Sequence, residues 1–399
     1  MGRLAALASA SSEETSSGVD AACVATQKRS ARPARSAGCA RYGPGTSPQS
    51  RGVGNTFPGL QMPVGSNAHL TICIVSRSAA ANSFGMNHLG RALTEYRDPP
   101  VKVLFVYNCN PAATVPDQKR VLKGLERDDL FTVVFEQVMT DTALYADVIL
   151  PSTTFLEGYD FAKAYGPIHM DLGRPVIDAA GEARSNADVF GELAGRLGLL
   201  EESDPTGELD LMLNVLDNLP GQIGADLRSG IPAAAPFGPA PVQFVDVFPK
   251  TPDQKIDLFP EALDAGAPMG LYRFQPDPAT ERFPLALISP ASERTISSTL
   301  GELPRPDVKL TMHPEDARAR GLANGDLVRI FNELGEVHCP LSVAPAIRPG
   351  VVSLPKGIWR RSTRNNTTGT ALVPDTLTDI GGGACFNDAR VQVASLATA

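Results

Sequence analysis

The sequence lacks closely spaced cysteines. Its 399 residues hold only six, and no two form a CxxC-type pair. They are Cys23, Cys39, Cys73, Cys109, Cys339 and Cys385. This spacing excludes the usual zinc-ribbon and iron–sulfur patterns, and six scattered thiols do not form the disulfide framework of a small secreted domain. The cysteine pattern predicts reduced thiols in a cytoplasmic protein.

Long apolar runs and an excess of positive charge are also missing. No stretch approaches the roughly 18 apolar residues of a membrane helix, which predicts no membrane span. Lysine and arginine number 36 against 44 acidic residues, a net charge of −8 that offers no basic face for nucleic acid. The hydrophobic content of 43% is enough for a buried core, and the length of 399 residues predicts two or three domains.

The first 60 residues are rich in Ser, Ala, Arg and Gly and have no periodic apolar face. We interpret residues 1–60 as disordered or as a non-native start of a truncated or misread gene, and we favour the second interpretation. A transit peptide is a third possibility, which Glu13, Glu14 and Asp20 oppose.

Three apolar runs alternate with two helix-like segments between Val101 and Pro151. Strands are expected near 101–107, 130–135 and 147–150. Their β-branched composition without polar alternation is typical of parallel strands buried on both faces. Asp117 offers a cap for the first helix, and Thr140 with Asp141 for the second. The pattern predicts an α/β parallel-sheet nucleotide-binding domain over residues 85–200.

Polar side chains stand at the carboxyl ends of these runs, where open α/β sheets bind ligands. The candidate cofactor-binding residues there are Asn108, Asn110, Pro111, Thr140, Asp141 and Thr142, and Glu136 and Gln137 end the second strand. Such amides and hydroxyls suit ribose, guanine and phosphate, although taken singly they are more often turn and cap residues. No GxGxxG motif follows Val106 or Val134, which disfavours a nicotinamide dehydrogenase.

The sequence pattern of the second half of the chain changes at two points. Residues 201–280 carry many prolines and glycines and are interpreted as a linker with some local structure. From Phe283, short strands with frequent turn signals predict a β-barrel domain over residues 283–395. Within it, Pro314 begins a short helix that Gly321 ends.

Two stretches resemble a known family. The run TDTALYADVILPSTTFLEGYD, preceded by a strand that ends in Asn-Pro, resembles the molybdopterin oxidoreductase superfamily, whose members carry molybdenum or tungsten on two pterin guanine dinucleotides. Residues 283–393 resemble its dinucleotide-binding domain, a double-psi β-barrel. The resemblance begins near Leu89, and LPKGIWRRST and DTLTDIGGGACFNDARV point to formate-dehydrogenase-like members.

The resemblance implies further cofactor contacts in the barrel. The implied residues are Arg294, Thr295, Ser298, Thr299, Asn365, Asn366, Phe386 and Asn387. Arg294 and the hydroxyls suit pyrophosphate and pterin edges, whereas the alternative is an ordinary capped turn. The glycines at 381–383 allow close backbone approach or form only a flexible loop. Thr370 stands where the family usually has Asn, a departure that bears on one polar contact.

The resemblance implies two-electron redox chemistry at molybdenum on a small-molecule substrate. The metal-binding side chain, the iron–sulfur cysteines and the other pterin-binding domain belong to the family's N-terminal half, so no catalytic or metal-binding residue is assigned. His169, alone in its stretch, is interpreted as a surface residue. The chain is expected to share molybdopterin guanine dinucleotide with a separately encoded N-terminal half or electron-transfer subunit, and to be inactive alone.

The alternative hypothesis is a non-catalytic nucleotide-binding or scaffold protein that keeps the fold. An upstream reading frame that encodes a cysteine cluster would favour the enzyme.

Overall fold

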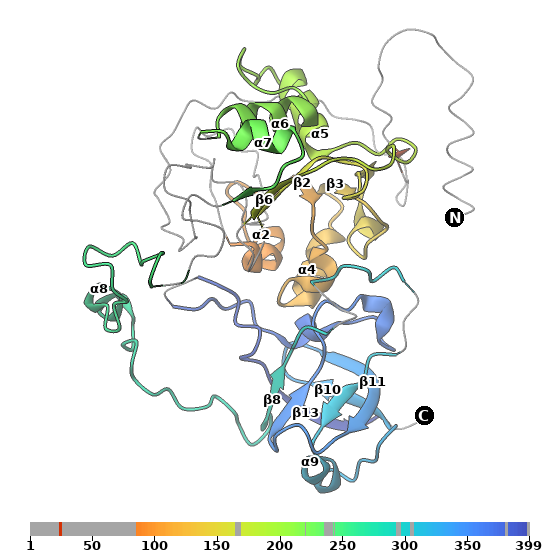
Figure 1. The fold of residues 1–399 in the computed structure, drawn as a ribbon. Coiled ribbons are helices and arrows are strands. Elements are labelled where there is room, and N and C mark those ends of the chain that lie inside the picture. The colour runs from red at the N-terminus through yellow and green to blue at the C-terminus, as the bar shows by residue number, and fades with distance from the viewer. Residues whose placement is uncertain are drawn as a thin grey trace.

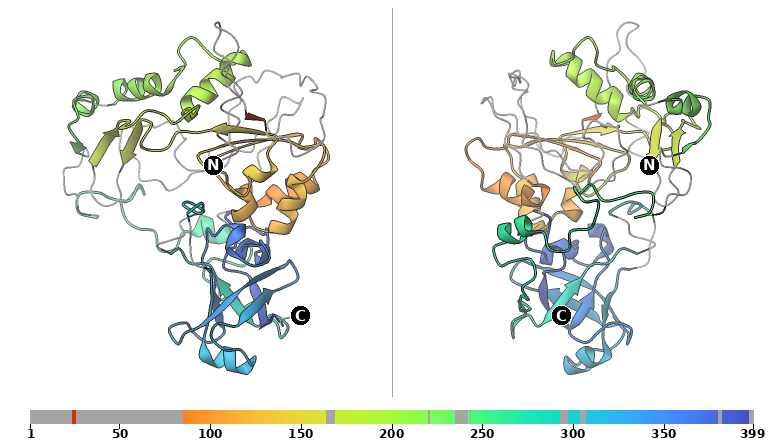
Figure 2. Two further views of the ribbon diagram at one scale, coloured as in Figure 1. Left: turned by 90° about the vertical axis from the view of Figure 1, so that its right-hand side faces the viewer. Right: turned by 60° about the vertical axis from the view of Figure 1, so that its left-hand side comes forward.

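The computed structural model of the chain describes residues 24–25, 85–163, 169–219, 221–234, 242, 244–292, 297–303, 307–379 and 382–396. An α/β unit and a barrel lie end to end in it, joined by a long extended segment (Figures 1 and 2). The prediction for residues 1–60 falls outside the described residues except for Val24–Ala25, a two-residue strand, β1. No helix of the described part is long and apolar enough to cross a membrane.

The α/β unit is built on the predicted parallel sheet. Its parallel strands are β2 (Val103–Tyr107), β3 (Phe131–Glu136) and β4 (Val148–Pro151), in the order β4-β3-β2. Strand β1 pairs antiparallel with β4 at the edge. The three strands begin one or two residues later than expected, and the parallel α/β class is confirmed.

One face of this sheet is covered by helices, more completely over β2 and β3 than over β4. Helices α2 (Leu89–Thr94) and α4 (Gln118–Leu125) pack on it, with η1 (Met86–His88) before them. A Cβ at Gly124 would lie 2.4 Å from the Cβ of Leu93, so this glycine lets the two helices approach closely. The predicted cap of α4 is present, because the Asp117 side chain accepts a hydrogen bond from the Arg120 backbone N–H.

The expectation of burial on both faces is wrong for β2. Leu104 and Val106 are buried against α2 and α4, but the alternate residues Val103, Phe105 and Tyr107 are only partly covered. The reason is that a single ring, Phe190 of α5 (Asn186–Arg196), contacts Phe105 and Tyr107 there, at centroid distances of 5.6 and 5.0 Å.

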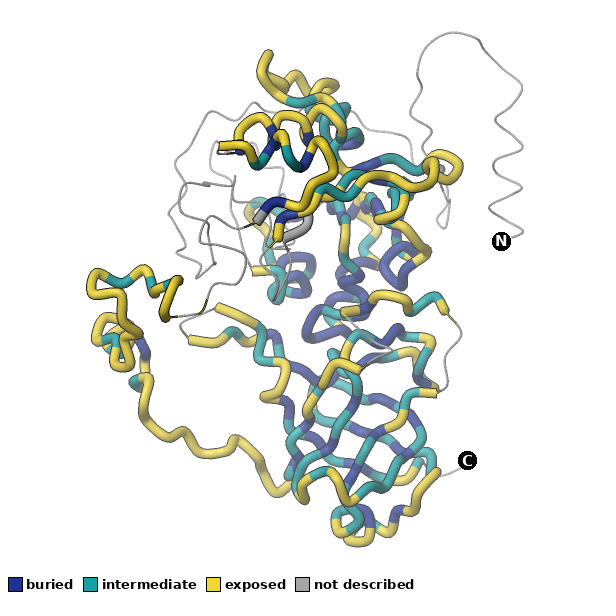
Figure 3. Tube along the Cα trace, viewed as in Figure 1, coloured by how far each residue is buried: buried dark blue, intermediate teal, exposed yellow. Residues whose placement is uncertain are grey.

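A second, smaller sheet follows the first. It contains β5 (Asp160–Lys163), β6 (His169–Gly173) and β7 (Ala233–Ala234), in that order. Helices α6 (Glu208–Asp217) and α7 (Ile223–Arg228) lie beside it, and together they bury Met170, Met212, Leu216 and Leu227. The stretch interpreted as a linker therefore includes these two helices, and the short α8 (Glu261–Gly266) stands in its exposed later part (Figure 3).

The C-terminal part is a closed barrel of six strands, as the short strands and turns predict. Its strands are β8 (Leu285–Ile288), β9 (Leu310–Met312), β10 (Leu327–Phe331), β11 (Glu336–Val343), β12 (Val351–Ser353) and β13 (Arg390–Ser395). They close in the order β10-β11-β9-β12-β8-β13, with β9/β11 and β8/β12 parallel and the other pairs antiparallel. The predicted helix is present as α9 (Pro314–Ala319), followed by Gly321 at a φ of +65°.

Candidate functional site

The carboxyl ends of the parallel strands face loops of the barrel. Strand β2 leads into α3 (Pro111–Thr114), and β3 is followed by η2 (Ala143–Tyr145). From the barrel side, residues 297–303 and the segment containing η3 (Arg360–Ser362) and η4 (Gly369–Leu372) approach the same edge. The junction therefore brings together predicted residues from both halves of the chain.

Asn110 lies at the centre of the junction and is 4% exposed. Its Nδ2 donates to Ser298 Oγ at 3.0 Å, and its Oδ1 accepts from the Thr142 backbone N–H at 3.1 Å and from Thr142 Oγ1 at 2.8 Å. Thr142 Oγ1 in turn accepts from the Ala112 N–H at 3.0 Å. Three of the predicted site residues thus contact one another, and this network ties the sheet edge to the barrel.

Asp141 makes a second link between the two parts. Its Oδ2 accepts from the Arg360 backbone N–H at 2.9 Å, and the Arg360 guanidinium donates to Tyr145 Oη at 2.7 Å. Burial raises the pKa of Asp141, and hydrogen bonds and charge from Arg360 oppose that rise only in part. Asp141 is 6% exposed, and a carboxylate at a strand end is the kind of acceptor that a guanine N–H edge can use.

A third link was not predicted from the sequence. Gln118, the first residue of α4, is 1% exposed, and its Nε2 donates to Thr368 Oγ1 at 3.1 Å while its Oε1 accepts from the Thr368 N–H at 3.0 Å. Thr368 and Thr370 both donate to the Ala113 carbonyl, at 2.8 and 3.1 Å. Thr370 therefore makes a domain contact, despite its departure from the family pattern. Only the cluster of hydroxyls in RNNTTGT could have signalled this link.

The loop at 297–303 is held in an unusual backbone conformation. Ser297, Ser298 and Leu300 have positive φ values of 48°, 72° and 58°. The Ser298 carbonyl accepts from Trp359 Nε1 at 2.9 Å. A Cβ at Gly301 would lie 2.0 Å from that same nitrogen, so only glycine fits beside the indole. Positive φ at non-glycine residues costs on the order of 1 kcal/mol or more each and is concentrated at ligand sites.

The remaining predicted residues fall into three groups, which are structural, exposed or outside the described residues. Asn365 is structural, because its Oδ1 accepts from the His338 N–H at 3.0 Å and its Nδ2 donates to the Glu336 carbonyl at 3.0 Å. Pro111 and Thr140 are buried, and Thr140 Oγ1 accepts from the Ala143 N–H at 3.2 Å, which is the predicted cap. The exposed predicted residues are Asn108, Thr299, Asn366, Phe386 and Asn387. Arg294 and Thr295 lie outside the described residues.

These positions decide which groups could hold a cofactor. Asn110, Thr142 and Ser298 use their polar atoms on one another, whereas the exposed Asn108 and Asn366 offer amide groups at the junction. Asn366 is fixed at a φ of +55° and its carbonyl accepts from Arg360 Nε at 2.8 Å. The exposed amides of Asn108 and Asn366 offer hydrogen-bond donors and acceptors that fit a guanine dinucleotide.

Glu136 is the ionisable residue at the end of β3. Burial raises its pKa, and the charge of Glu302, from the loop at 297–303, raises it further. Gln137 donates its side-chain amide to the Thr153 carbonyl at 2.9 Å and so makes a local contact.

Within the described residues, no group of three or more His, Cys, Asp or Glu side chains could hold a metal ion. His169 is exposed at the start of β6. The described cysteines Cys109, Cys339 and Cys385 are free thiols. Burial raises the pKa of Cys109 to about 11 and that of Cys339 to about 12, which makes both poor nucleophiles and poor metal ligands at neutral pH.

A parallel α/β unit whose strand ends meet a closed barrel is an architecture for binding a nucleotide-type cofactor. The chain matches the family "Molybdopterin oxidoreductase" over residues 50–196 and the "Molydopterin dinucleotide binding domain" over residues 287–390. The chain belongs to the molybdopterin oxidoreductase superfamily, and the two matches support molybdopterin guanine dinucleotide as its cofactor. The first match begins at residue 50, so the expectation that the resemblance starts near Leu89 is wrong. The short apolar run LTICIV at residues 70–75 was too isolated for its periodicity to indicate that the family match extends there.

Related proteins are named as oxidoreductases. The chain is 34% identical over 319 residues to "Probable oxidoreductase YoaE" of Bacillus subtilis (strain 168), covering 78% of this chain and 46% of that protein. It is 28% identical over 315 residues to "Dimethyl sulfoxide reductase DmsA" of Escherichia coli (strain K12), covering 66% and 37%. The solved structure of "Acetylene Hydratase from Pelobacter acetylenicus" shares the fold, with a TM-score of 0.65, 21% identity and coverage of 78% and 46%. The chain thus spans less than half the length of these proteins.

Proposed function

We propose that the chain forms two walls of the cofactor site of a molybdenum-dependent oxidoreductase and that another polypeptide supplies the remaining walls. The main support for this proposal is the junction itself, where Asn110, Asp141 and Ser298 join the two family domains. Around it, the exposed Asn108 and Asn366 are the groups we assign to the dinucleotide, and the exposed Thr299, Phe386 and Asn387 are further candidates. When bound, the cofactor supplies two-electron exchange with a small-molecule substrate.

The substrate class follows from the relatives rather than from this site. Proteins similar to the chain are named for dimethyl sulfoxide and for trimethylamine-N-oxide reduction. We therefore propose an oxide-reductase-like activity for the complete enzyme. Formate oxidation stays a prediction from the sequence and is tested beside it.

The test is to express the chain in a host that makes the cofactor and to measure bound molybdenum and pterin. Reduction of dimethyl sulfoxide and trimethylamine N-oxide with an artificial donor, and oxidation of formate with an artificial acceptor, are assayed in parallel. We expect less than stoichiometric molybdenum and no turnover, because half the enclosing walls are supplied elsewhere. Turnover that returns on adding an upstream-encoded half supports the split enzyme.

Two results would change the proposal. Stoichiometric molybdenum with turnover by the chain alone would show that the chain is a sufficient enzyme. A chain that binds guanosine diphosphate but never molybdopterin, with or without an upstream half, would favour the scaffold alternative.

We further propose that residues 85–200 and 283–395 act as separate domains, that the barrel is of the double-psi type, and that the protein works in the cytoplasm. Support for the barrel type is its mixture of two parallel pairs with antiparallel ones. The free thiols are in keeping with a reducing compartment.

Limited proteolysis tests the domain division. We expect the first cuts between 244 and 280, where Leu258 is 80% and Phe274 is 88% exposed, because proteases act on accessible, weakly packed chain. Mass spectrometry of the fragments locates the cuts. First cuts within 310–345, inside the barrel, would contradict the boundary.

A further inference from the structure

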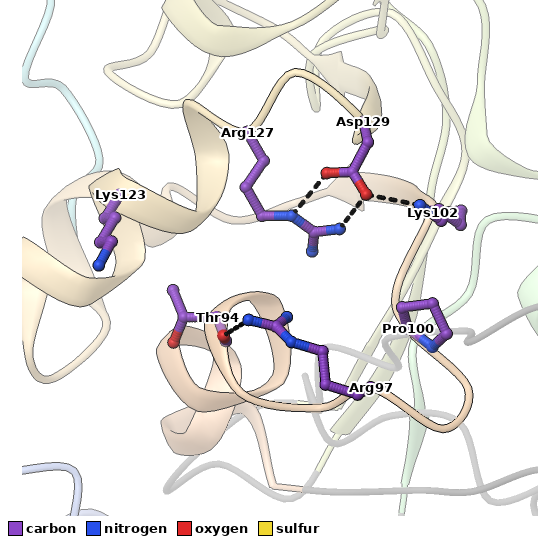
Figure 4. Close-up of a pocket in the computed structure, with 7 residues that line it drawn as sticks. All are labelled: Thr94, Arg97, Pro100, Lys102, Lys123, Arg127 and Asp129. Atoms are coloured by element: carbon purple, nitrogen blue, oxygen red, sulfur yellow. Dashed lines mark hydrogen bonds and ion pairs between the residues drawn. The ribbon is translucent and has the colours of Figure 1, made fainter.

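A cavity of about 460 Å³ lies at the amino ends of the parallel strands, at the sheet edge opposite the candidate cofactor site. Its wall combines the end of α2, the chain leading into β2, the end of α4 and the turn before β3 (Figure 4). The lining residues are Thr94, Arg97, Pro100, Lys102, Lys123, Arg127 and Asp129. A cavity of this size suits a small molecule.

The charge of this cavity is opposite to that of the chain. Its wall holds the four cations Arg97, Lys102, Lys123 and Arg127 and the single carboxylate Asp129, which leaves three positive charges. The whole chain carries a net charge of −8. Such a local concentration of cations within an acidic protein attracts anions.

Two of the cations are held in place by the carboxylate. Arg127 donates to Asp129 through Nε at 2.9 Å and through Nη2 at 2.8 Å, and its Nη1 donates to the Leu93 carbonyl at 2.7 Å. Lys102 Nζ lies 2.5 Å from Asp129 Oδ2. Hydrogen bonds from Arg127 and then from Lys102 hold the pKa of Asp129 well below its usual range, so the carboxylate stays ionised. Asp129 therefore holds both Arg127 and Lys102, and its single negative charge neutralises only one of these two cations.

The other two cations have no such partner. Across the residues that the structure describes, no carboxylate lies within ion-pair distance of Arg97 or Lys123. Arg97 donates one N–H to the Thr94 carbonyl at 2.5 Å, which leaves the other N–H groups of its guanidinium available to a ligand. Figure 4 shows Lys123 on α4, whereas Arg97 stands on the connection between α2 and β2 that also carries Lys102.

We propose that this cavity binds a small phosphate-bearing molecule. Arginine forks and lysine ammonium groups that converge from several elements match the tetrahedral oxygens of a phosphate. Stabilisation of helix C-termini accounts for a cation at the end of α2 or of α4 taken alone. It does not account for Lys102, which precedes a strand, faces the same space and pairs with Asp129 there.

The experiment measures binding of pyrophosphate to the purified chain by calorimetry. The variant Arg97→Gln with Lys123→Gln removes the two unpartnered cations and keeps the Arg127–Asp129–Lys102 set. We expect its dissociation constant to rise about tenfold or more, because the variant loses both cations that have no carboxylate partner and their charge-assisted hydrogen bonds to the phosphate oxygens. Lys119→Gln, an exposed lysine of α4 that does not line the cavity, is the matched control and should bind as the parent does.

The remaining outcomes also decide the matter. Equal affinity in the double variant and the parent overturns the site. Loss of binding in Asn366→Ala but not in the double variant places pyrophosphate at the cofactor junction and overturns it as well. Malonate serves as a dicarboxylate probe, and tighter binding of malonate than of pyrophosphate overturns the phosphate class. Because the assay contains no molybdenum cofactor, its result is independent of the proposed oxidoreductase function.

Discussion

Replacement of Asp375 with alanine is expected to lower the free energy of unfolding by about 2–3 kcal/mol. Asp375 follows η4, and its carboxylate receives Arg91 Nε and Nη2 of α2, both at 2.5 Å, and Arg120 Nη1 of α4 at 3.3 Å. The side chain is 8% exposed, so removing it leaves two arginines beside a nearly buried space. We place the effect below that of a fully buried pair because the Arg91 side chain is 38% exposed.

The measurement is urea unfolding followed by the fluorescence of Trp359, the single tryptophan of the chain, which is 2% exposed. Asp307→Ala is the matched control. It removes the Asp307–Arg364 pair, whose side chains are 51% and 57% exposed, and should cost less than about 1 kcal/mol. Equal effects of the two substitutions would contradict the assigned role of Asp375.

The effect of Asp375→Ala should also depend on pH. Burial raises the pKa of Asp375, but the hydrogen bond and charge of Arg91 and the charge of Arg120 outweigh it, and the net pKa is lowered. A carboxyl whose folded-state pKa is lowered stabilises the fold above its unfolded pKa of about 3.9 and loses this contribution as the pH falls through the folded value. The difference between parent and variant should therefore be constant from pH 8 to about 5 and shrink below about pH 4.

Replacement of Asn110 with alanine is expected to cost about 2–3 kcal/mol and to detach the loop at 297–303. The substitution removes the acceptor of the buried Thr142 N–H and the donor to Ser298 Oγ. A buried N–H without a partner costs about 1–3 kcal/mol, and Thr142 is fully buried. Because Ser298 also accepts from Trp359, the tryptophan emission should shift to longer wavelength as water reaches the indole.

The matched control is Asn387→Ala. Asn387 is an exposed candidate cofactor residue. Its Oδ1 accepts from the Ser289 N–H at 3.3 Å, a long hydrogen bond at an exposed site, so its loss should leave both stability and emission nearly unchanged. Unaltered emission in Asn110→Ala would show that the loop is held without Asn110. The amount of cofactor retained is a second measurement. Asn387→Ala should lower it, although the substitution leaves stability nearly unchanged.

The parallel sheet could be predicted because local chemistry determines it. Apolar β-branched runs end at Asn-Pro, Glu-Gln and Pro, and Asp117 and Thr140 cap the helices between them, all within about 50 residues of sequence. The closed barrel followed in the same way from short strands and turn residues. The expectation that β2 is buried on both faces was wrong because it also rested on local sequence alone. An apolar strand does not reveal how much of each face its neighbours cover.

The junction was predicted only in part. Asn110, Asp141 and Ser298 were expected to face a ligand, and the structure places them together but uses them on each other. Gln118 and Asp375 were missed, because their partners lie about 250 to 284 residues away in the chain. No periodicity connects residues so far apart, and a polar residue that will meet its partner across domains is indistinguishable from a surface residue.

The exposed segment between the two parts affects how tightly they must bind each other. About 40 residues, from Phe244 to Arg282, join the α/β side to the first barrel strand, and they contribute little to either core. A flexible chain of that length spans roughly 35 Å and keeps its ends at an effective concentration on the order of millimolar. The contacts of Asn110, Gln118 and Asp375 therefore need only millimolar intrinsic affinity to keep the junction mostly closed.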